Sequence, residues 1–332
     1  MQLHTCLKAV SPRPTNAAMQ KKSFKRSIAD YATATLGFDD CRFTGIETGN
    51  STRVYEQWLK DGCSGTMAYL KKHRALKSNP RLLLPGARSA IVVIKNYKNT
   101  LQQHLTQKLK ISRYAVGADY HHVIAARLKK IEDYIAQLNP AIQWYSGVDS
   151  KPIFERGLAV KAGVGFLGKN AMVIRPGMGS YFFIGIVLTT ADIEPDAPLT
   201  QNCGSCRRCI DACPAGAIRN DRTVDAVKCT SYKNIERTEP LTEKEIARSR
   251  GWLFGCDICQ EACPHNRDSV PLTDWDEFLP GAGVGFDFFD TKKCLVAADI
   301  PRDSALYRSR SRIVVNFRTA RALLTTQPRS KK

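Results

Sequence analysis

The sequence lacks long apolar segments and is poor in acidic residues. Its longest largely apolar run, residues 181–188, is far shorter than the roughly 20 residues that span a bilayer. Residues 1–20 contain neither a continuous apolar segment nor a twin-arginine pair, so no export signal is expected. Asp and Glu number 31 against 50 Lys and Arg, which leaves a formal net charge of +19. We therefore expect a cytoplasmic protein without a membrane anchor, whose charge favours a polyanionic partner, either nucleic acid or an anionic membrane.

Internal repeats and low-complexity tracts are also lacking, so the 332 residues, 43% of them hydrophobic, are expected to form about two domains. Apolar residues at helical spacing predict helices over 19–36, 120–138 and 153–162. β-Branched and apolar runs predict strands over 87–94, 108–114, 142–148, 172–174 and 181–190. Strands that alternate with helices favour an α/β (or α+β) domain.

Composition divides the chain into four segments. Residues 1–20 are interpreted as a loose leader and 21–198 as the α/β domain, which ends at a proline-containing stretch. Residues 199–268 form a cysteine-rich module. Residues 269–332 form a short basic tail with a predicted helix over 308–321.

The sequence contains 12 cysteines. Disulfides do not explain them in a compartment that keeps thiols reduced, so metal or redox chemistry is favoured. Eight lie between residues 203 and 263. The other four, which we expect to be packed or incidental thiols, are Cys6, Cys41, Cys63 and Cys294.

The clustered cysteines follow the spacing of bacterial ferredoxins. Residues 203–214 read C-x-x-C-x-x-C-x-x-x-C-P, in which three thiolates hold one iron–sulfur cube and the fourth reaches a second cube. A shorter half, C-x-x-C-x-x-x-C-P, follows at 256–264, and Cys229 supplies the thiolate that it lacks. Crossing the ligands predicts two complete [4Fe-4S] sites: Cys203, Cys206, Cys209 and Cys263 for one, and Cys213, Cys229, Cys256 and Cys259 for the other.

Two alternatives to a cluster-containing enzyme follow from the same residues. C-x-x-C pairs also bind zinc, so a zinc-containing, non-catalytic nucleic-acid-binding protein is one of them. A ferredoxin-like electron carrier is the other, but about 200 residues precede the module, which favours an enzyme that uses the electrons.

The order of motifs closely resembles the epoxyqueuosine reductase family. The resemblance covers roughly residues 22–320, and the matching motifs outside the ferredoxin run are RYA at 113–115, DYH at 119–121, VDSKP at 148–152, ER at 155–156, AGVGFLGKN at 162–170, KCTSY at 228–232 and LFGCD at 253–257. It implies a cobalamin-binding α/β domain followed by a twin [4Fe-4S] module. Members reduce epoxyqueuosine in the tRNA anticodon to queuosine, with electrons passed from the clusters to base-off cobalamin.

The resemblance assigns the proton donor of this reaction to Asp149. A free Asp has a pKa of about 3.9, so burial or negative neighbours would have to raise the pKa of Asp149 close to neutrality. Lys151 would oppose that rise if it pointed inward. As an alternative, Asp149 only caps a helix that starts near Pro152.

Further site residues come from the same resemblance. Those expected near the corrin are Tyr114, Asp119, Tyr120, His121, Gly163, Gly165, Gly168 and Lys169. The glycine spacing also matches a dinucleotide fingerprint, but it follows a predicted helix instead of a strand, so we favour an approach to the corrin.

The resemblance also implies tRNA as partner, with Lys233, Asn234 and Arg237 near the anticodon loop. Basic residues at 71–74, in the first helix and at 308–321 are candidates for phosphate contact. We expect a monomer that takes electrons from a low-potential donor. A reductive dehalogenase, which shares cobalamin and twin clusters, is the competing enzyme class, but its usual twin-arginine signal is not found here and its small substrates do not explain the positive charge.

Overall fold

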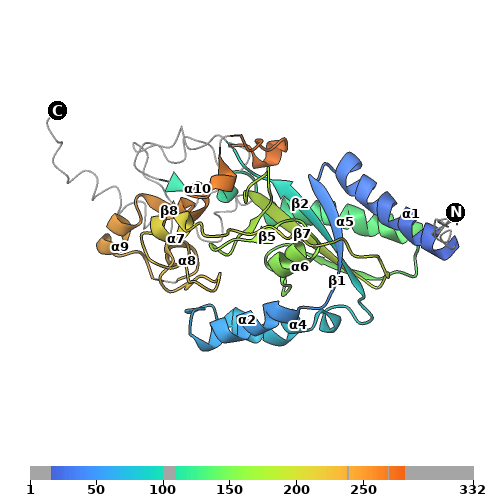
Figure 1. Ribbon diagram of the computed structural model, residues 1–332, viewed down its shortest axis with the longest axis horizontal. Helices are drawn as coiled ribbons and strands as arrows, with labels where there is room; N and C mark the ends of the chain where they lie inside the picture. The colour runs from blue at the N-terminus through green and yellow to red at the C-terminus, as the bar shows by residue number, and fades with distance from the viewer. Residues whose placement is uncertain (1–15, 100–109, 238, 268, 281–332) are drawn as a thin grey trace, which may run out of the picture.

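The computed structural model describes residues 16–99, 110–237, 239–267 and 269–280 (Figure 1). Its centre is a four-stranded sheet in the order β1-β2-β7-β4, and every neighbouring pair is antiparallel. The strands are β1 (Asp40–Gly45), β2 (Ser89–Asn96), β7 (Phe182–Thr189) and β4 (Trp144–Gly147). The predicted mixture of helices and strands is confirmed. Antiparallel pairing makes the domain α+β, because parallel β-α-β units do not build this sheet.

Helices cover both faces of the sheet. One face carries α1 (Asn16–Asp30), its π-helical continuation η1 (Tyr31–Thr35) and α5 (Tyr120–Leu138). The other face carries α6 (Glu155–Lys161). Alternate residues of β2 divide between the two cores: Ile91 and Val93 pack with α1 and α5, while Val92 and Ile94 pack with α6. This two-sided burial explains why β2 is apolar throughout.

Local patterns predicted most of these elements. The helix predicted over 120–138 is confirmed residue for residue, and the one over 153–162 appears as α6. The first helix begins at Asn16, so residues 16–20 of the predicted leader are helical, while residues 1–15 lie outside the described residues. Of the strand predicted over 108–114, residues 108 and 109 lie outside the described residues; the rest contains β3 (Lys110–Ile111) and the start of the 3-10 turn η4 (Arg113–Ala115).

Short helices between β1 and β2 form a layer apart from the sheet (Figure 1), which we call the arch, residues 49–78. It contains α2 (Gly49–Lys60), α3 (Ala68–Lys72) and α4 (Arg74–Ser78). On the sheet domain, the Tyr55 ring of the arch meets Phe154, just before α6, edge to face at 5.2 Å. On the cysteine module, Trp58 Nε1 donates to the Val224 carbonyl at 2.7 Å, and Thr66 N donates to Tyr232 Oη at 2.8 Å. The arch therefore connects the sheet domain to the cysteine module.

The cysteine module is joined to the sheet domain by backbone pairing. Its elements are α7 (Arg208–Ala212), α8 (Thr230–Ile235), α9 (Glu243–Arg248), β8 (Trp252–Phe254), α10 (Ile258–Glu261) and η5 (Pro264–Asn266). Strand β8 pairs in parallel with β3, which comes from the sheet domain. The expected boundary at residue 198 therefore separates two segments of the sequence that remain paired in the structure, because β3 lies before it and β8 after it.

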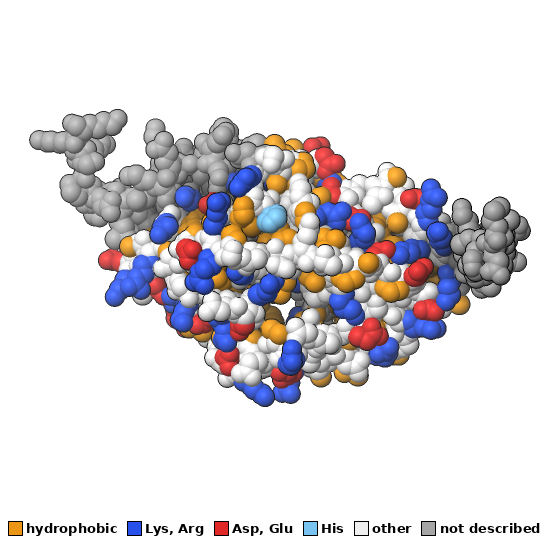
Figure 2. Space-filling model, in the orientation of Figure 1, with side chains coloured by type: hydrophobic (Ala, Val, Ile, Leu, Met, Phe, Trp, Pro, Cys, Tyr) orange, Lys and Arg blue, Asp and Glu red, His pale blue; other side chains and the backbone are white. Residues whose placement is uncertain are grey.

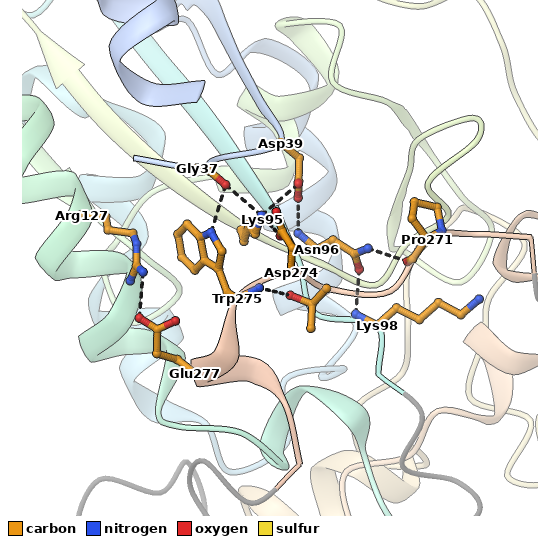
Figure 3. Close-up of polar contacts among 11 residues, drawn as sticks. Gly37, Asp39, Lys95, Asn96, Lys98, Arg127, Pro271, Asp274, Trp275 and Glu277 are labelled. Carbon is orange, nitrogen blue, oxygen red and sulfur yellow. Dashed lines mark hydrogen bonds and ion pairs between the residues drawn. The ribbon is translucent and has the colours of Figure 1, made fainter. Parts of the chain in front are cut away.

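After the module the chain returns to the sheet domain through a segment that we call the strap, residues 270–279, which includes η6 (Asp276–Phe278). Lys95, fully buried on β2, donates to the Gly37 carbonyl at 2.8 Å and pairs with Asp39 at 3.1 Å and with Asp274 of the strap (Figure 3). Trp275 Nε1 also donates to the Gly37 carbonyl, at 3.0 Å. The predicted basic tail therefore starts as a strap on the sheet domain; its remainder, with the helix predicted over 308–321, lies outside the described residues.

In the part of the chain that the structure describes, no helix combines the length and the apolar character that a membrane span requires.

The buried ammonium of Lys95 yields a stability prediction. Lys95→Met removes the cation and leaves the Asp39 carboxylate without a positive charge to balance it, so we expect a loss of about 3 kcal/mol in unfolding free energy. Urea unfolding of the anaerobic protein, followed by far-UV circular dichroism, measures it. Lys129→Met, on the exposed face of α5, is the matched control and should leave the midpoint unchanged. Equal midpoints for both variants would contradict the role assigned to Lys95.

Candidate functional site

Four of the eight clustered thiols surround one cavity. Cys203, Cys206, Cys209 and Cys263 line a space of about 60 Å³, together with Ile174 and Lys169 from the sheet domain. Burial raises the pKa of Cys209, and the neighbouring thiolates of Cys203 and Cys263 raise it further. Thiols that surround a cavity and act on one another electrostatically fit a shared cluster. This is the first ligand set predicted from spacing.

The other four thiols also act as one group. Burial raises the pKa of Cys256 to about 12, and the charges of Cys229 and Cys213 add to that rise. Burial likewise raises the pKa of Cys259, and the charges of Cys256, Cys229 and Cys213 act on it in the same direction. The amide of Ala217 donates to the Cys213 sulfur at 3.4 Å, a contact of the kind that tunes cluster potentials. These residues are the second predicted set, including Cys229.

The loop predicted to approach the corrin attaches the cysteine module to the sheet domain. Lys169 Nζ donates to the carbonyls of Gly204 and Cys206, both at 2.9 Å, inside the loop of the first thiol set. Asn170 Nδ2 donates to the Cys259 carbonyl at 3.4 Å, in the second set. Lys169 is therefore a contact of the cluster loop, a role that the sequence did not indicate.

The glycines of the same loop are explained by close contacts with protein atoms. A Cβ at Gly163 would lie 2.1 Å from the Ala197 carbonyl oxygen, and one at Gly165 would lie 2.4 Å from that of Ile174. Gly168 is crowded by Ile174 and Asn170 side chains. The segment follows α6 and leads into β5 (Phe166–Leu167), which pairs with β6 (Val173–Ile174), so it does not open a helix as a dinucleotide fingerprint should. Glycine here is required by packing and is no sign of a corrin contact, which stays a prediction.

Asp149 lies on the loop between β4 and α6 with an unusual backbone conformation. Its φ of 51° is in the left-handed region, which Asp tolerates better than most residues. Its amide donates to the carboxylate of Glu155, the first residue of α6. The alternative that Asp149 caps this helix is wrong, because the N-cap is Phe154 and no side chain caps it. Glu155 thus holds the loop that presents Asp149.

The Asp149 carboxylate meets a histidine held by a second carboxylate. Asp119 is the N-cap of α5 and accepts from the His121 amide at 3.0 Å. The same carboxylate bonds His121 Nδ1 at 2.7 Å, and His121 Nε2 lies 3.3 Å from Asp149 Oδ2. The Tyr120 ring stacks on His121 and on Phe183, with centroids 4.1 Å and 4.2 Å away. Two of the predicted cofactor residues, Tyr120 and His121, therefore contact the predicted proton donor, and a third, Asp119, holds His121.

The pKa of Asp149 is shifted in the opposite direction to the one expected from the sequence. Burial raises its pKa, but the His121 hydrogen bond and charge, a Tyr120 hydrogen bond and Arg156 outweigh burial, so the pKa is lowered overall. The expected rise toward neutrality is wrong for the protein without ligands. Lys151, the cation that could have opposed such a rise, instead lies over the Tyr145 ring at 5.7 Å.

Two neighbours of Asp149, His121 and Glu155, have pKa values raised above their usual range. Burial lowers the pKa of His121, but its hydrogen bonds to the carboxylates of Asp119 and Asp149 outweigh burial and raise the pKa to about 9. Burial and the charge of Asp149 raise the pKa of Glu155 to about 8. The sequence analysis overlooked Glu155 as a functional residue, although it belongs to a motif shared with the family; no local pattern shows that it bonds the Asp149 amide.

Asp149 faces a hollow that protein surrounds. Its side chain is 62% exposed, yet burial is the largest influence on its pKa, as expected for a group on the wall of a concave space. Figure 2 shows the molecule hollowed between the arch and the rest of the chain. The charge of Asp149 acts on the pKa of Tyr69 and of Lys77, so these two residues of the arch lie near it. The sequence did not predict that the arch takes part in the site.

Tyr114 links this hollow to the second thiol set. Its ring stands edge to face with Tyr120 at 6.0 Å and packs 6.1 Å from Phe254, next to the Cys256 loop. A Cβ at Gly255 would lie 3.4 Å from the Tyr114 ring. The second thiol set is therefore the one connected to Asp149 by packed aromatic side chains.

Comparison with known proteins agrees with this arrangement. Residues 77–150, which end just after Asp149, match the family model described as epoxyqueuosine reductase QueG, DUF1730. Residues 202–266, which contain all eight thiols, match the model of a 4Fe-4S double cluster binding domain. An epoxyqueuosine reductase of Cellulophaga algicola is 38% identical over 257 residues, which cover 76% of this chain and 83% of the relative. The chain belongs to the epoxyqueuosine reductase family.

Solved structures of epoxyqueuosine reductases share the fold. The enzyme from Streptococcus thermophilus superimposes with a TM-score of 0.76 at 24% identity, over 94% of this chain and 83% of that one. An epoxyqueuosine reductase crystallised with an epoxyqueuosine-modified tRNA stem loop has a TM-score of 0.72 at 25% identity, over 92% and 84% of the two chains. Membership of this family and the match to a 4Fe-4S domain argue against the zinc-protein and dehalogenase alternatives.

The family resemblance had also assigned three tRNA contacts, and one of them is wrong. Asn234 is fully buried, and its amide bonds the backbone of Gly255 in both directions at 3.0 Å. It leaves no side-chain surface for RNA, since it holds α8 against the Cys256 loop. Lys233 and Arg237 are partly exposed and both pair with Glu245, at 3.3 Å and 2.8 Å. Their contact with tRNA stays a prediction.

The remaining cysteines partly follow the expectation. Cys41 and Cys63 are buried thiols, as predicted, and Arg219 donates to the Cys63 sulfur at 2.9 Å. Cys6 and Cys294 lie outside the described residues.

The grouping of thiols predicts the outcome of removing one ligand. Cys229→Ala should lower the iron content of the reconstituted protein from about eight to about four atoms per chain, because only the second set loses a thiolate. Iron analysis of anaerobic protein measures this. Cys41→Ala, a buried thiol outside both sets, should keep the full content. A full iron complement in Cys229→Ala would refute the assignment of the ligands.

Proposed function

We propose that this protein reduces epoxyqueuosine in tRNA to queuosine. The observation that supports this proposal is that Tyr114 packs between the Asp149 hollow and the second of the two four-thiol sites. The chain that contains both sites belongs to the epoxyqueuosine reductase family and matches a 4Fe-4S double cluster domain. The segment 21–198 would supply the hollow and 199–268 the thiol sites. The reaction would take place on tRNA in the cytoplasm. One chain would suffice, because Asp149 and both thiol sets belong to it.

The residues of each site fit the cofactors that the family implies. Two [4Fe-4S] clusters would be held by the two thiol sets described above. Cobalamin would occupy the hollow, with Tyr114, Tyr120 and His121 on the sheet side and the arch on the other. When bound, cobalamin would supply a cobalt centre that accepts single electrons from the clusters and makes them available for reducing a carbon–oxygen bond. A low-potential donor outside this chain would refill the clusters.

The protein side of the chemistry concerns protons. Removing an epoxide oxygen as water, and leaving an alkene, consumes two electrons and two protons. An epoxide oxygen leaves poorly as an alkoxide, so an acid must protonate it as the carbon–oxygen bond breaks. The exposed Asp149 carboxyl, fixed by the Glu155 contact, is positioned to deliver this proton into the hollow.

Nucleoside analysis tests the proposed activity. The reconstituted protein, with cobalamin and a low-potential reductant, should convert tRNA carrying epoxyqueuosine to queuosine, seen as the loss of one oxygen by mass spectrometry. Brown absorption of both clusters with no conversion would contradict the proposal. Reduction of a small halogenated compound with no reaction on tRNA would favour the dehalogenase class.

Asp149→Asn tests the role of the acid. The amide keeps the size of the side chain but carries no transferable acidic proton, so turnover should fall by at least about 100-fold. Iron content and cobalamin binding should match those of the unmodified protein. Asp192→Asn, at an exposed ion pair with Lys21, is the matched control and should retain full turnover. Full turnover by Asp149→Asn would remove this residue from the mechanism.

A further inference from the structure

Asp149 is one end of a hydrogen-bonded chain of three side chains. Asp119 bonds His121 Nδ1 at 2.7 Å, and His121 Nε2 reaches Asp149 Oδ2 at 3.3 Å. Asp119 is buried, His121 is half-buried, and only Asp149 is open to the hollow. The order of burial gives the chain a direction, from the interior to the place where substrate would bind.

Both ends of this chain are held by the backbone. The Asp119 carboxylate caps α5, and the amide of the preceding residue, Ala118, donates to the Glu277 carbonyl of the strap at 2.7 Å. Gly117 leaves room for this contact, because a Cβ there would lie 2.5 Å from the same carbonyl oxygen. At the other end the Glu155 carboxylate accepts the Asp149 amide. The imidazole is therefore positioned between two carboxylates that cannot easily move apart.

The stoichiometry of the proposed reaction asks for more protons than Asp149 can store. Two protons leave with the oxygen as water, whereas a carboxyl group carries at most one. The His121 hydrogen bond and charge, a Tyr120 hydrogen bond and Arg156 lower the pKa of Asp149, which favours its carboxylate form over the acid. A second group must therefore supply protons to it.

We propose that His121, oriented by Asp119, is the positioning residue that hands protons to Asp149, so that Asp149 relays protons instead of storing one. This inference rests on the proposed reduction of an epoxide. In the step, the Nε2–H bond of the imidazolium breaks as an O–H bond forms on Asp149 Oδ2. That O–H bond then breaks as the proton passes to the epoxide oxygen. His121 is left neutral, with Nδ1–H bonded to Asp119, and takes its next proton from solvent.

Charged and titratable groups of several elements face this relay. The groups that interact with Asp119, His121 or Asp149 are Tyr69 of α3, Lys77 of α4, Tyr114 of η4, Tyr120 and His122 of α5, and Glu155 and Arg156 of α6, while Glu236 after α8 acts on Tyr69 and Tyr114. Glu155 is the one most able to imitate His121 in a pH profile, because its pKa is raised to about 8 and that of His121 to about 9. The test must therefore separate these two titrations.

Single-turnover rates across pH provide the first measurement. The rate should fall as pH rises through the pKa of His121, because the imidazole carries the proton to be transferred below that pKa and has lost it above. In Glu155→Gln, whose amide oxygen can still accept the Asp149 amide, this alkaline fall should persist. His121→Gln should lower the neutral rate by about 100-fold and lose the fall. His122→Gln, the exposed neighbour on α5, is the matched control and should stay within about twofold of the unmodified enzyme.

Two further readouts separate a proton role from a structural one. Free imidazole should partly restore the rate of His121→Gly and leave that of Asp149→Asn unchanged. The 15N NMR titration of His121 in the oxidised holoenzyme, assigned with His121→Gln, should give a pKa well above 6.5 that drops in both Asp119→Asn and Asp149→Asn. This titration needs no substrate, so it tests the relay even if tRNA is not converted.

The outcomes distinguish the two proposals. Conversion of tRNA with an ordinary His121 pKa, or with an unchanged rate and pH profile in His121→Gln, would overturn the relay and leave the reductase standing. No conversion together with a raised His121 pKa that depends on both carboxylates would overturn the reductase and support the hydrogen-bonded chain. Rescue of His121→Gly by imidazole, together with loss of the alkaline fall in rate in His121→Gln, supports the relay as a whole.

Discussion

Eight thiols from two stretches of chain must converge into two four-sulfur sites, and the rest of the architecture follows from this constraint. The sheet domain meets the first site through Lys169 and Ile174 and reaches the second through Asn170. The glycines of this loop let it pack closely on Ala197 and Ile174 of the sheet domain itself. A segment that resembles a nucleotide-binding loop in sequence is thus the joint between the electron-carrying module and the catalytic domain.

Electrons and protons would reach the hollow through different residues. The second thiol set reaches it through Tyr114, whereas protons would arrive through His121, which Asp119 orients. The strap ties the second route to the fold, because Glu277 bonds the backbone beside Asp119 while Asp274 pairs with the buried Lys95 (Figure 3). Residues far from the reacting atoms therefore fix the geometry of the proton route.

The sequence predicted what local patterns encode. The period of α5, the apolar run of β2 and the ferredoxin spacing each depend on neighbouring residues, and all three were recovered. The antiparallel strand order and the arch depend on contacts between distant segments, which no local pattern contains. Asn234 was misassigned for the same reason, since β8 buries it. The pKa of Asp149 was predicted in the wrong direction because it is decided by His121, 28 residues earlier.

The arrangement of the two cubes is the claim on which electron transfer to the hollow depends. Diffraction from crystals of the reconstituted protein, recorded with wavelengths on both sides of the iron absorption edge, tests it most directly. We expect two separate iron peaks, one surrounded by Cys203, Cys206, Cys209 and Cys263 and one by Cys213, Cys229, Cys256 and Cys259. Anomalous signal at the zinc edge, or a peak bound by cysteines of both groups, would contradict the account.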